Sequence, residues 1–243
     1  VPFLSASLFG WHTPSGADWA AASDDYGVEI YAVRTSTTSK DAYFLIRSRA
    51  GYGASSATAI TTTDLTSSVY KDVYDNEKWN FSVSFKHAKE DAGFDVVSGS
   101  TDTQNAVELE FYGVNMIQDV VVNEFLLTAS SLNHKYLSND RRYYLGAHRE
   151  NFNSTLQTST YSRISSLRHW QSYLGTGSIR AHAMDPDNYG ARNPFSKSAH
   201  FTDVELGGLT GSVHVPEIAT LALNWDYHRV TGSDDSGEFF VED

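Results

Sequence analysis

The glutamates of Glu108-Leu109-Glu110 come closest, by residue type and spacing, to a catalytic pair. Residues two apart on a strand share a face, and retaining glycosidases place two carboxylates about 5 Å apart across the scissile bond. The same spacing also fits the solvent-facing side of an amphipathic strand. We expect the solvent-facing arrangement, and we therefore predict that the protein is not an enzyme.

Oxygen-bearing side chains also gather between Asp185 and Gly190, in Asp-Pro-Asp-Asn-Tyr-Gly. Carboxylate and amide oxygens are the ligands that calcium prefers, so Asp185, Asp187 and Asn188 are the candidate metal ligands and calcium is the cofactor they would bind. The segment lacks the Asp-x-Asp-x-Asp-Gly regularity of a calcium loop, and its composition is also typical of a turn that ends a helix. Both interpretations stay open, and the turn is the simpler one.

The nine histidines are scattered along the chain, without a His-x-His or His-x-x-x-His pair on one element. That spacing gives no reason to expect a zinc site. His169 and His182 are expected to take part in local packing or hydrogen bonds instead. Gly-x-Ser-x-Gly and phosphate-binding loop motifs are also absent from the sequence.

Aromatic side chains in predicted loops are the candidate ligand-binding residues. Aromatic rings stack on the apolar faces of sugars, so exposed rings at these positions could bind a glycan, although a β-sandwich also buries many of its aromatic residues. The candidates are Trp11, Trp19, Tyr26 and Tyr52.

The charge of the chain limits its partners. The 243 residues carry 18 Lys and Arg against 30 Asp and Glu, for a formal net charge of −12. Such a balance repels phosphate backbones, so we expect no nucleic-acid partner. No apolar run approaches the roughly 20 residues needed to span a bilayer, so we also expect no membrane span. The start at Val1-Pro2 and the acidic end suggest a piece of a longer polypeptide or a processed product.

Short β-type runs recur along the chain between turn signals, as in a sandwich or barrel. The best is 78–87, in which Trp79, Phe81, Val83 and Phe85 alternate with polar residues at the period of a strand. Further strands are predicted at 3–11, 28–33, 43–47, 107–112, 120–128, 143–147 and 163–170.

One short helix is predicted near 178–185, with Ser178 as its N-cap and Asp185-Pro186 as its end. Ile179 and Ala183 would share its buried face. An apolar strand ending at Trp, an Asp-rich turn with Gly and a second apolar strand occur at 4–30 and again at 218–240. We therefore predict one domain over 1–205 and a C-terminal β segment over 206–243 that could begin a second similar module.

The order of these parts resembles the concanavalin A-like and laminin-G-like jelly-roll superfamily. The resemblance covers about residues 3–192. It is carried by a strand led by Trp79, by the Tyr-Leu-Gly of Tyr144-Leu145-Gly146, and by Ile164 to Trp170 followed by Leu174 and the short helix. It implies an all-β fold, a two-sheet antiparallel jelly-roll sandwich. Retaining glycosidases of this superfamily carry Glu-x-Asp-x-(x)-Glu, and no third carboxylate follows Glu110 at Tyr112 or Gly113.

Three further segments are similar to large structural proteins of marine tailed bacteriophages: Phe111 to Asn115, Arg142 to Arg149 and Ala181 to Gly190. This resemblance implies a non-enzymatic structural or adhesion module of a virion, extracellular in location. Its partners would be other virion protein subunits and host surface polysaccharide, within a larger polypeptide or oligomer. The alternative is a stand-alone carbohydrate-binding lectin that depends on calcium.

Overall fold

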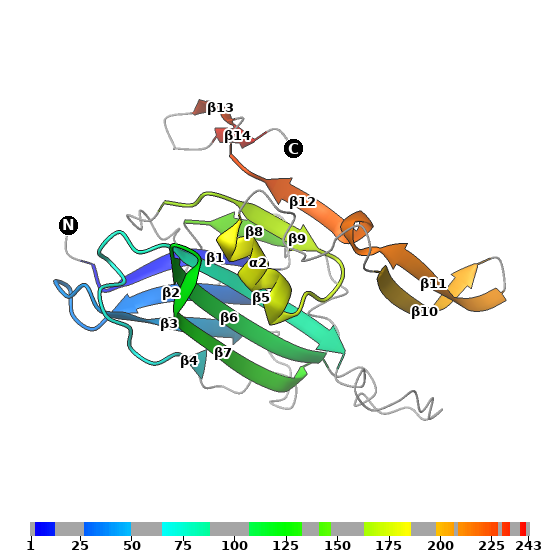
Figure 1. Ribbon diagram of the computed structural model, residues 1–243, viewed down its shortest axis with the longest axis horizontal. Helices are drawn as coiled ribbons and strands as arrows, with labels where there is room; N and C mark the ends of the chain where they lie inside the picture. Colours follow the sequence, from blue (N-terminus) through cyan, green and yellow to red (C-terminus); the bar gives the residue numbers. More distant parts are fainter. Residues whose placement is uncertain are drawn as a thin grey trace. The chain divides into compact units, whose positions relative to one another are not determined.

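The computed structural model describes residues 3–12, 27–49, 65–87, 107–132, 141–146, 163–185, 198–206, 209–227, 230–233 and 239–241. In this part of the chain the fold is antiparallel β-sheet with one α-helix, as predicted (Figure 1). The chain divides into two compact units. The first comprises Val1–Ile117 and Val121–Arg163, and the second comprises Gln118–Val120 and Ile164–Asp243. The division at 163 lies upstream of the boundary predicted at 205.

The larger sheet of the first unit has five strands in the order β4-β3-β2-β1-β8. Their bounds are β1 (Ser5–His12), β2 (Gly27–Arg34), β3 (Ala42–Arg49), β4 (Leu65–Thr66) and β8 (Arg142–Leu145). The central strand β2 pairs with β1 on one side and with β3 on the other, both antiparallel, and a bulge interrupts β1 between Ser7 and Phe9. This sheet contains four of the predicted strands, those at 3–11, 28–33, 43–47 and 143–147.

The second sheet has three strands in the order β5-β6-β7, with β5 at Trp79–His87, β6 at Val107–Ile117 and β7 at Val120–Leu132. A two-residue turn joins β6 to β7. Its residues Gln118 and Asp119 have φ angles of 50° and 63°, the left-handed values of a type I′ turn, which matches the twist of a hairpin.

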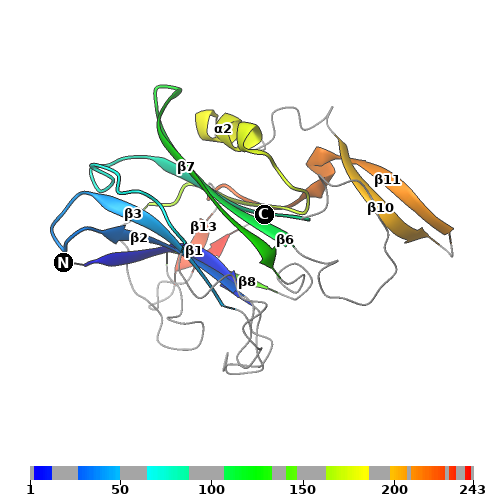
Figure 2. The ribbon, with the colours of Figure 1, turned by 90° about the horizontal axis from the view of Figure 1, so that it is seen from below.

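One hydrophobic core lies between these two sheets, which Figure 2 shows as neighbouring layers of strands. Period-two alternation places Val28, Ile30 and Ala32 of β2 on the inner face of the larger sheet, opposite Leu109 and Phe111 of β6. Trp79, Phe81, Val83 and Phe85 of β5 pack against this cluster, so the strand and its buried face are confirmed.

Gly113 fits the core because it has no side chain. A Cβ at this position would lie 2.4 Å from Cε1 of Phe125 and 3.1 Å from Cδ1 of Phe81. The glycine in Phe111-Tyr112-Gly113 thus makes room for the Phe125 ring, and a larger residue there would overpack the sandwich.

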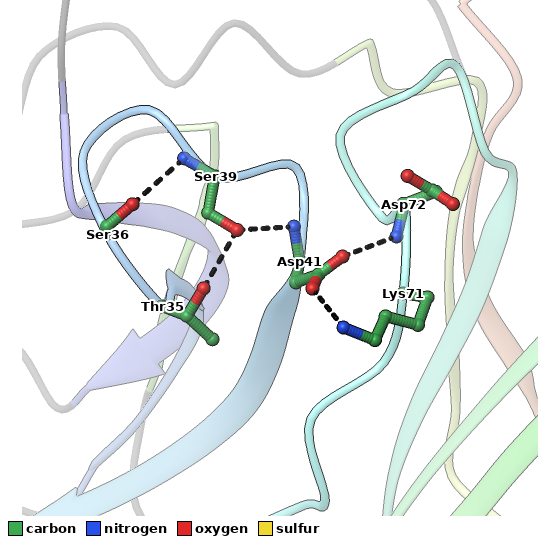
Figure 3. A network of polar contacts seen from close by, with 6 residues as sticks. All are labelled: Thr35, Ser36, Ser39, Asp41, Lys71 and Asp72. Atoms are coloured by element: carbon green, nitrogen blue, oxygen red, sulfur yellow. Dashed lines mark hydrogen bonds and ion pairs between the residues drawn. The ribbon is translucent and has the colours of Figure 1, made fainter.

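A network of polar contacts joins the β2–β3 connection to the segment after β4 (Figure 3). Asp41 is its centre: Lys71 Nζ lies 2.6 Å from Oδ2 of Asp41, and the backbone N–H of Asp72 donates to Oδ1 at 3.1 Å. These two donors hold the pKa of the Asp41 carboxyl below its ordinary value, and the carboxylate raises the pKa of Lys71. Ser39 completes the network, since its Oγ accepts from Thr35 and from the backbone N–H of Asp41.

Tyr74 lies in the same segment, with its ring beside the Arg34 guanidinium, which is 5.1 Å from the ring centroid. Burial raises the pKa of Tyr74 to about 12, and the Arg34 charge opposes this shift. Its hydroxyl is buried and has no hydrogen-bond partner among the described residues. A buried polar group left without a partner costs about 1–3 kcal/mol.

We therefore expect Tyr74→Phe to raise the free energy of unfolding by about 1 kcal/mol, measured by urea denaturation at pH 7. Because the pKa is raised on folding, the folded protein loses stability as pH rises from about 10 through about 12. The variant should lose less stability than the wild type over that range. Tyr43→Phe, at a half-buried position of β3, is the matched control. An equal increase in the free energy of unfolding in both variants would contradict the prediction.

The second unit contains the helix α2 (Thr176–Met184) and the strand pair β9 (Leu167–Trp170) and β12 (Leu221–Trp225). It also contains the hairpins β10 (Ser198–Leu206) with β11 (Leu209–Pro216), and β13 (Val230–Ser233) with β14 (Phe239–Val241), and the short 3-10 helix η3 (Glu217–Thr220). β9, predicted to finish the first module, pairs with β12 from the predicted C-terminal segment. The sequence analysis did not predict β10 and β11.

The predicted helix is confirmed, with one correction at its start. α2 begins at Thr176 after the N-cap Gly175, and no side chain caps it. Ser178, predicted as the N-cap, lies inside the helix and is buried with Ile179 and Ala183. The end at Asp185 and the buried Ile179 and Ala183 match the prediction.

The described residues include no helix long and apolar enough to cross a membrane.

Candidate functional site

The face of the five-stranded sheet that turns away from the core is the candidate functional site, and we call it the polar face. Directly opposed residues of antiparallel strands share a face, so the strand register defines its rows. One row runs Tyr144, Gly10, Glu29 and Arg47 across β8, β1, β2 and β3. The adjoining row contains Ser7, Tyr31, Leu45 and Thr66.

Glu29 is the most unusual residue of the polar face, because it is a carboxylate with no exposed surface. The Tyr31 hydroxyl donates to Oε2 of Glu29 at 2.6 Å. Arg47 is the direct cross-strand partner of Glu29, and its guanidinium lies 5.8 Å from the centroid of the Tyr31 ring. A buried carboxylate is costly to hold without such partners. We call these three residues the Glu29–Tyr31–Arg47 unit, which spans the neighbouring strands β2 and β3.

Small and polar residues surround this unit. Gly10 lies beside Glu29 in the register and adds no side chain, and Ser7 is fully buried next to Tyr31. Tyr144, half-buried on β8, continues the row beyond Gly10. Carboxylate, guanidinium, hydroxyl and aromatic groups are the ones that orient a polar ligand such as a sugar. The residues at the centre of the polar face are buried, namely Ser7, Gly10, Glu29, Tyr31 and Leu45. Arg47 and Tyr144 are its half-buried members, and the opposite face of the same strands is apolar.

The next row of the polar face contains Arg142, His12, Gly27 and Arg49. The two rows together bring three arginines and a histidine into register with one glutamate. No sequence pattern predicts this arrangement, since the arginines come from strands almost 100 residues apart. The one local signal is Glu29 itself, a charged residue within the apolar run Val28 to Val33.

Of the predicted sugar-stacking residues, Trp11 requires a correction. It lies in β1 with 6% of its surface exposed, in edge-to-face contact with Phe85 at 5.6 Å and beside Tyr143. Trp11 opposes Val28 in the register and therefore faces the core. Its ring is part of the core and is not available to a ligand. Trp19, Tyr26 and Tyr52 lie outside the described residues.

Of the predicted calcium ligands, Asp185 is the exposed C-cap residue of α2, and Asp187 and Asn188 lie outside the described residues. Asp185 thus has the helix-ending position that the turn interpretation requires. In the part of the chain that the structure describes, no three His, Asp or Glu side chains are grouped closely enough to hold a metal ion.

The pair Glu108 and Glu110 requires a second correction, because Glu110 is buried and Glu108 is half-buried, whereas both were predicted to face solvent. Glu110 is 8% exposed, and its neighbours on the same face, Tyr112 and Val114, are 3% and 1% exposed. Residues on both faces of the central strand β6 are buried, so its alternating sequence pattern does not indicate a solvent-exposed face. Glu110 lies opposite Ser84 of β5, and Glu108 lies opposite Lys86.

The hydrogen-bonding role expected of His182 is confirmed. Arg168 of β9 donates through Nη1 to the imidazole ring of His182, with Nε2 at 3.0 Å, and through Nε to Oδ1 of Asn224 on β12 at 2.6 Å. Arg168 thus ties α2 and β12 to β9 within the second unit. His169 is half-buried on β9 opposite Leu223.

The sequence matches no protein-family model, no curated protein and no solved structure.

Proposed function

We propose that this chain is a non-enzymatic adhesion module with a concanavalin A-like or laminin-G-like jelly-roll fold, and that it binds a glycan with the half-buried Tyr144 at the β8 end of the polar face. The observation that supports the proposal most directly is the pair of antiparallel sheets that share one hydrophobic core.

The setting that we propose is the surface of a bacteriophage virion, with other virion proteins as partners and host surface polysaccharide as the ligand. Two resemblances support this setting: the jelly-roll order of parts around Trp79 and Tyr144-Leu145-Gly146, and the three segments similar to structural proteins of tailed phages. Two sheets that share one core are compatible with such a module.

A glycan array incubated with the purified chain tests the proposal. We expect binding to at least one class of polysaccharide, and Tyr144→Ala should weaken it roughly tenfold if the ring stacks on a sugar. Tyr173→Ala removes a partly exposed tyrosine of the second unit and is the matched control. An array without any bound glycan would refute the proposal.

The same array with a chelator separates the adhesion module from a calcium-dependent lectin. We expect binding to persist in chelator. A parallel assay for newly formed reducing ends on the bound polysaccharide tests the non-enzymatic character of the protein. Steady release of reducing ends that Glu108→Gln or Glu110→Gln abolishes would show that it is a glycosidase.

A further inference from the structure

The strand β7 (Val120–Leu132) is the most exposed edge among the described strands of the first unit. It lies at the end of the sheet order β5-β6-β7 and is 13 residues long. The other edges are shorter or more covered, since β4 has two residues, β8 has four, and residues 79–85 of β5 are half-buried. On β7, by contrast, Val122 and Leu126 are 51% and 48% exposed. The edge of β7 is therefore the one that another chain can reach.

The backbone of β7 directs hydrogen-bonding groups to this edge. The Tyr70 hydroxyl donates to the carbonyl oxygen of Glu124 at 3.1 Å, so this carbonyl points away from β6. Backbone groups two residues apart on a strand point to the same side, so Leu126 and Thr128 present theirs at the edge as well. A carbonyl oxygen has two lone pairs, and the bond from Tyr70 leaves one of them for an added strand.

β7 lacks the features that protect an edge strand from pairing with another chain. Protected edges carry Lys or Pro, or they are very short. β7 contains no Lys, Arg or Pro, and Glu124 is its one charged residue. The neighbouring strand β6 adds Glu108 and Glu110 and no basic residue. The edge therefore combines exposed apolar side chains with acidic charge.

This charge selects the partner. If two copies of the chain paired antiparallel with Val122 opposite Leu126, the two Glu124 side chains would lie opposite each other, and like charges in that position are destabilising. Each copy would also carry a net charge of −12, which opposes self-association. A strand with Lys or Arg opposite Glu124 avoids both costs. In such strand addition, main-chain hydrogen bonds supply the affinity and alternate side chains supply the specificity.

We propose that the β7 edge is a docking site for an extended segment of a partner protein, in which Lys or Arg opposes Glu124 and apolar side chains lie beside Val122 and Leu126. This inference goes beyond glycan binding and does not depend on it, because Tyr144 belongs to the other sheet. Failure of one proposal therefore leaves the other standing.

Fluorescence anisotropy with labelled peptides and the full chain tests the inference. The matching peptide is Thr-Thr-Val-Thr-Lys-Thr-Val-Thr-Thr, which places Val, Lys and Val on one face of a strand, and the control peptide has Glu in place of Lys. We expect the Lys peptide to bind about fivefold more tightly, the difference between an opposite and a like charge across two strands. Methylation of the backbone nitrogens of the Lys peptide should abolish binding, because it removes the main-chain donors. Equal binding of the two peptides, no binding of the Lys peptide, or unchanged binding after methylation would overturn the inference.

Variants of the chain locate the binding to β7. Glu124→Lys should reverse the preference, so that the Glu peptide binds more tightly than the Lys peptide. Leu126→Lys should abolish binding of the Lys peptide, because it places a like charge beside the peptide lysine on an edge that had none. Leu4→Lys, at a position 49% exposed ahead of β1, is the matched control and should bind like the wild type.

Melting temperatures show whether each variant is folded, and an unreversed preference in folded Glu124→Lys would overturn the inference. Sedimentation of the chain without peptide tests the other occupant of the edge. A dimer that Leu126→Lys dissociates and Leu4→Lys does not would show that a second copy pairs with β7, and it would overturn the proposal of a basic partner.

Discussion

Phe44→Ala is expected to lower the free energy of unfolding by about 4 kcal/mol, the upper part of the range for large-to-small changes in a core. Phe44 is 1% exposed on β3. Its ring centroid lies 4.6 Å from that of Trp79, 4.7 Å from that of Phe81 and 5.5 Å from that of Phe125. The cavity would therefore open between the two sheets, where rings from β5 and β7 meet around Phe44, and close packing leaves no side chain free to fill it.

Urea denaturation followed by tryptophan fluorescence measures this loss, because Trp79 borders the cavity and reports on the packing. Leu126→Ala is the control. Leu126 lies on β7 with 48% of its surface exposed, so its truncation should cost less than about 1 kcal/mol. If Phe44→Ala costs no more than Leu126→Ala, the aromatic cluster does not hold the two sheets together.

Strand 79–87 and the helix were predictable from the sequence because their patterns are local. Alternation over Trp79 to Phe85 predicts both a strand and its buried face, and the structure confirms both. Ile179 and Ala183 predict the buried side of the helix in the same way. Each of these inferences needs only the period of one element, since that period fixes which residues share a side.

The hydrophobic pattern of one strand does not show whether other segments of the chain bury its second face. Glu108 and Glu110 alternate with apolar residues as on a half-exposed strand, yet Glu110 is buried. Trp11 ends a predicted strand near a loop, yet the register places it opposite Val28 in the core. In both cases burial depends on segments distant in the sequence, which the alternation of a single strand does not contain.

The polar face was unpredictable for the same reason. Arg47 becomes the neighbour of Glu29 only through the pairing of β2 with β3, and Arg142 joins the row only because β8 pairs with β1 across more than 100 residues of sequence. A sheet register is a long-range property. Glu29 within an apolar strand was the one local sign, because a buried carboxylate needs partners that the strand itself does not supply.

Glu29→Ala is expected to lower the free energy of unfolding by about 3 kcal/mol, since removal of one member of a buried charged unit leaves the others without their partner. The Tyr31 hydroxyl would lose its acceptor, and Arg47 would lose the carboxylate opposite it in the register. Thermal and urea denaturation of the wild type and of Glu29→Ala measure the difference in the free energy of unfolding.

Glu124→Ala is the matched control, because Glu124 also accepts from a tyrosine hydroxyl, that of Tyr112 at 2.8 Å, but lies exposed on β7. Exposure to water makes such a pair worth less than about 1 kcal/mol. Glu29→Gln separates the two contributions at the buried site: its amide oxygen can still accept from Tyr31, while the negative charge is lost. We expect the free energy of unfolding of Glu29→Gln to lie between that of the wild type and that of Glu29→Ala. A Glu29→Ala protein as stable as Glu124→Ala would mean that the buried carboxylate does not hold Tyr31 and Arg47 in place.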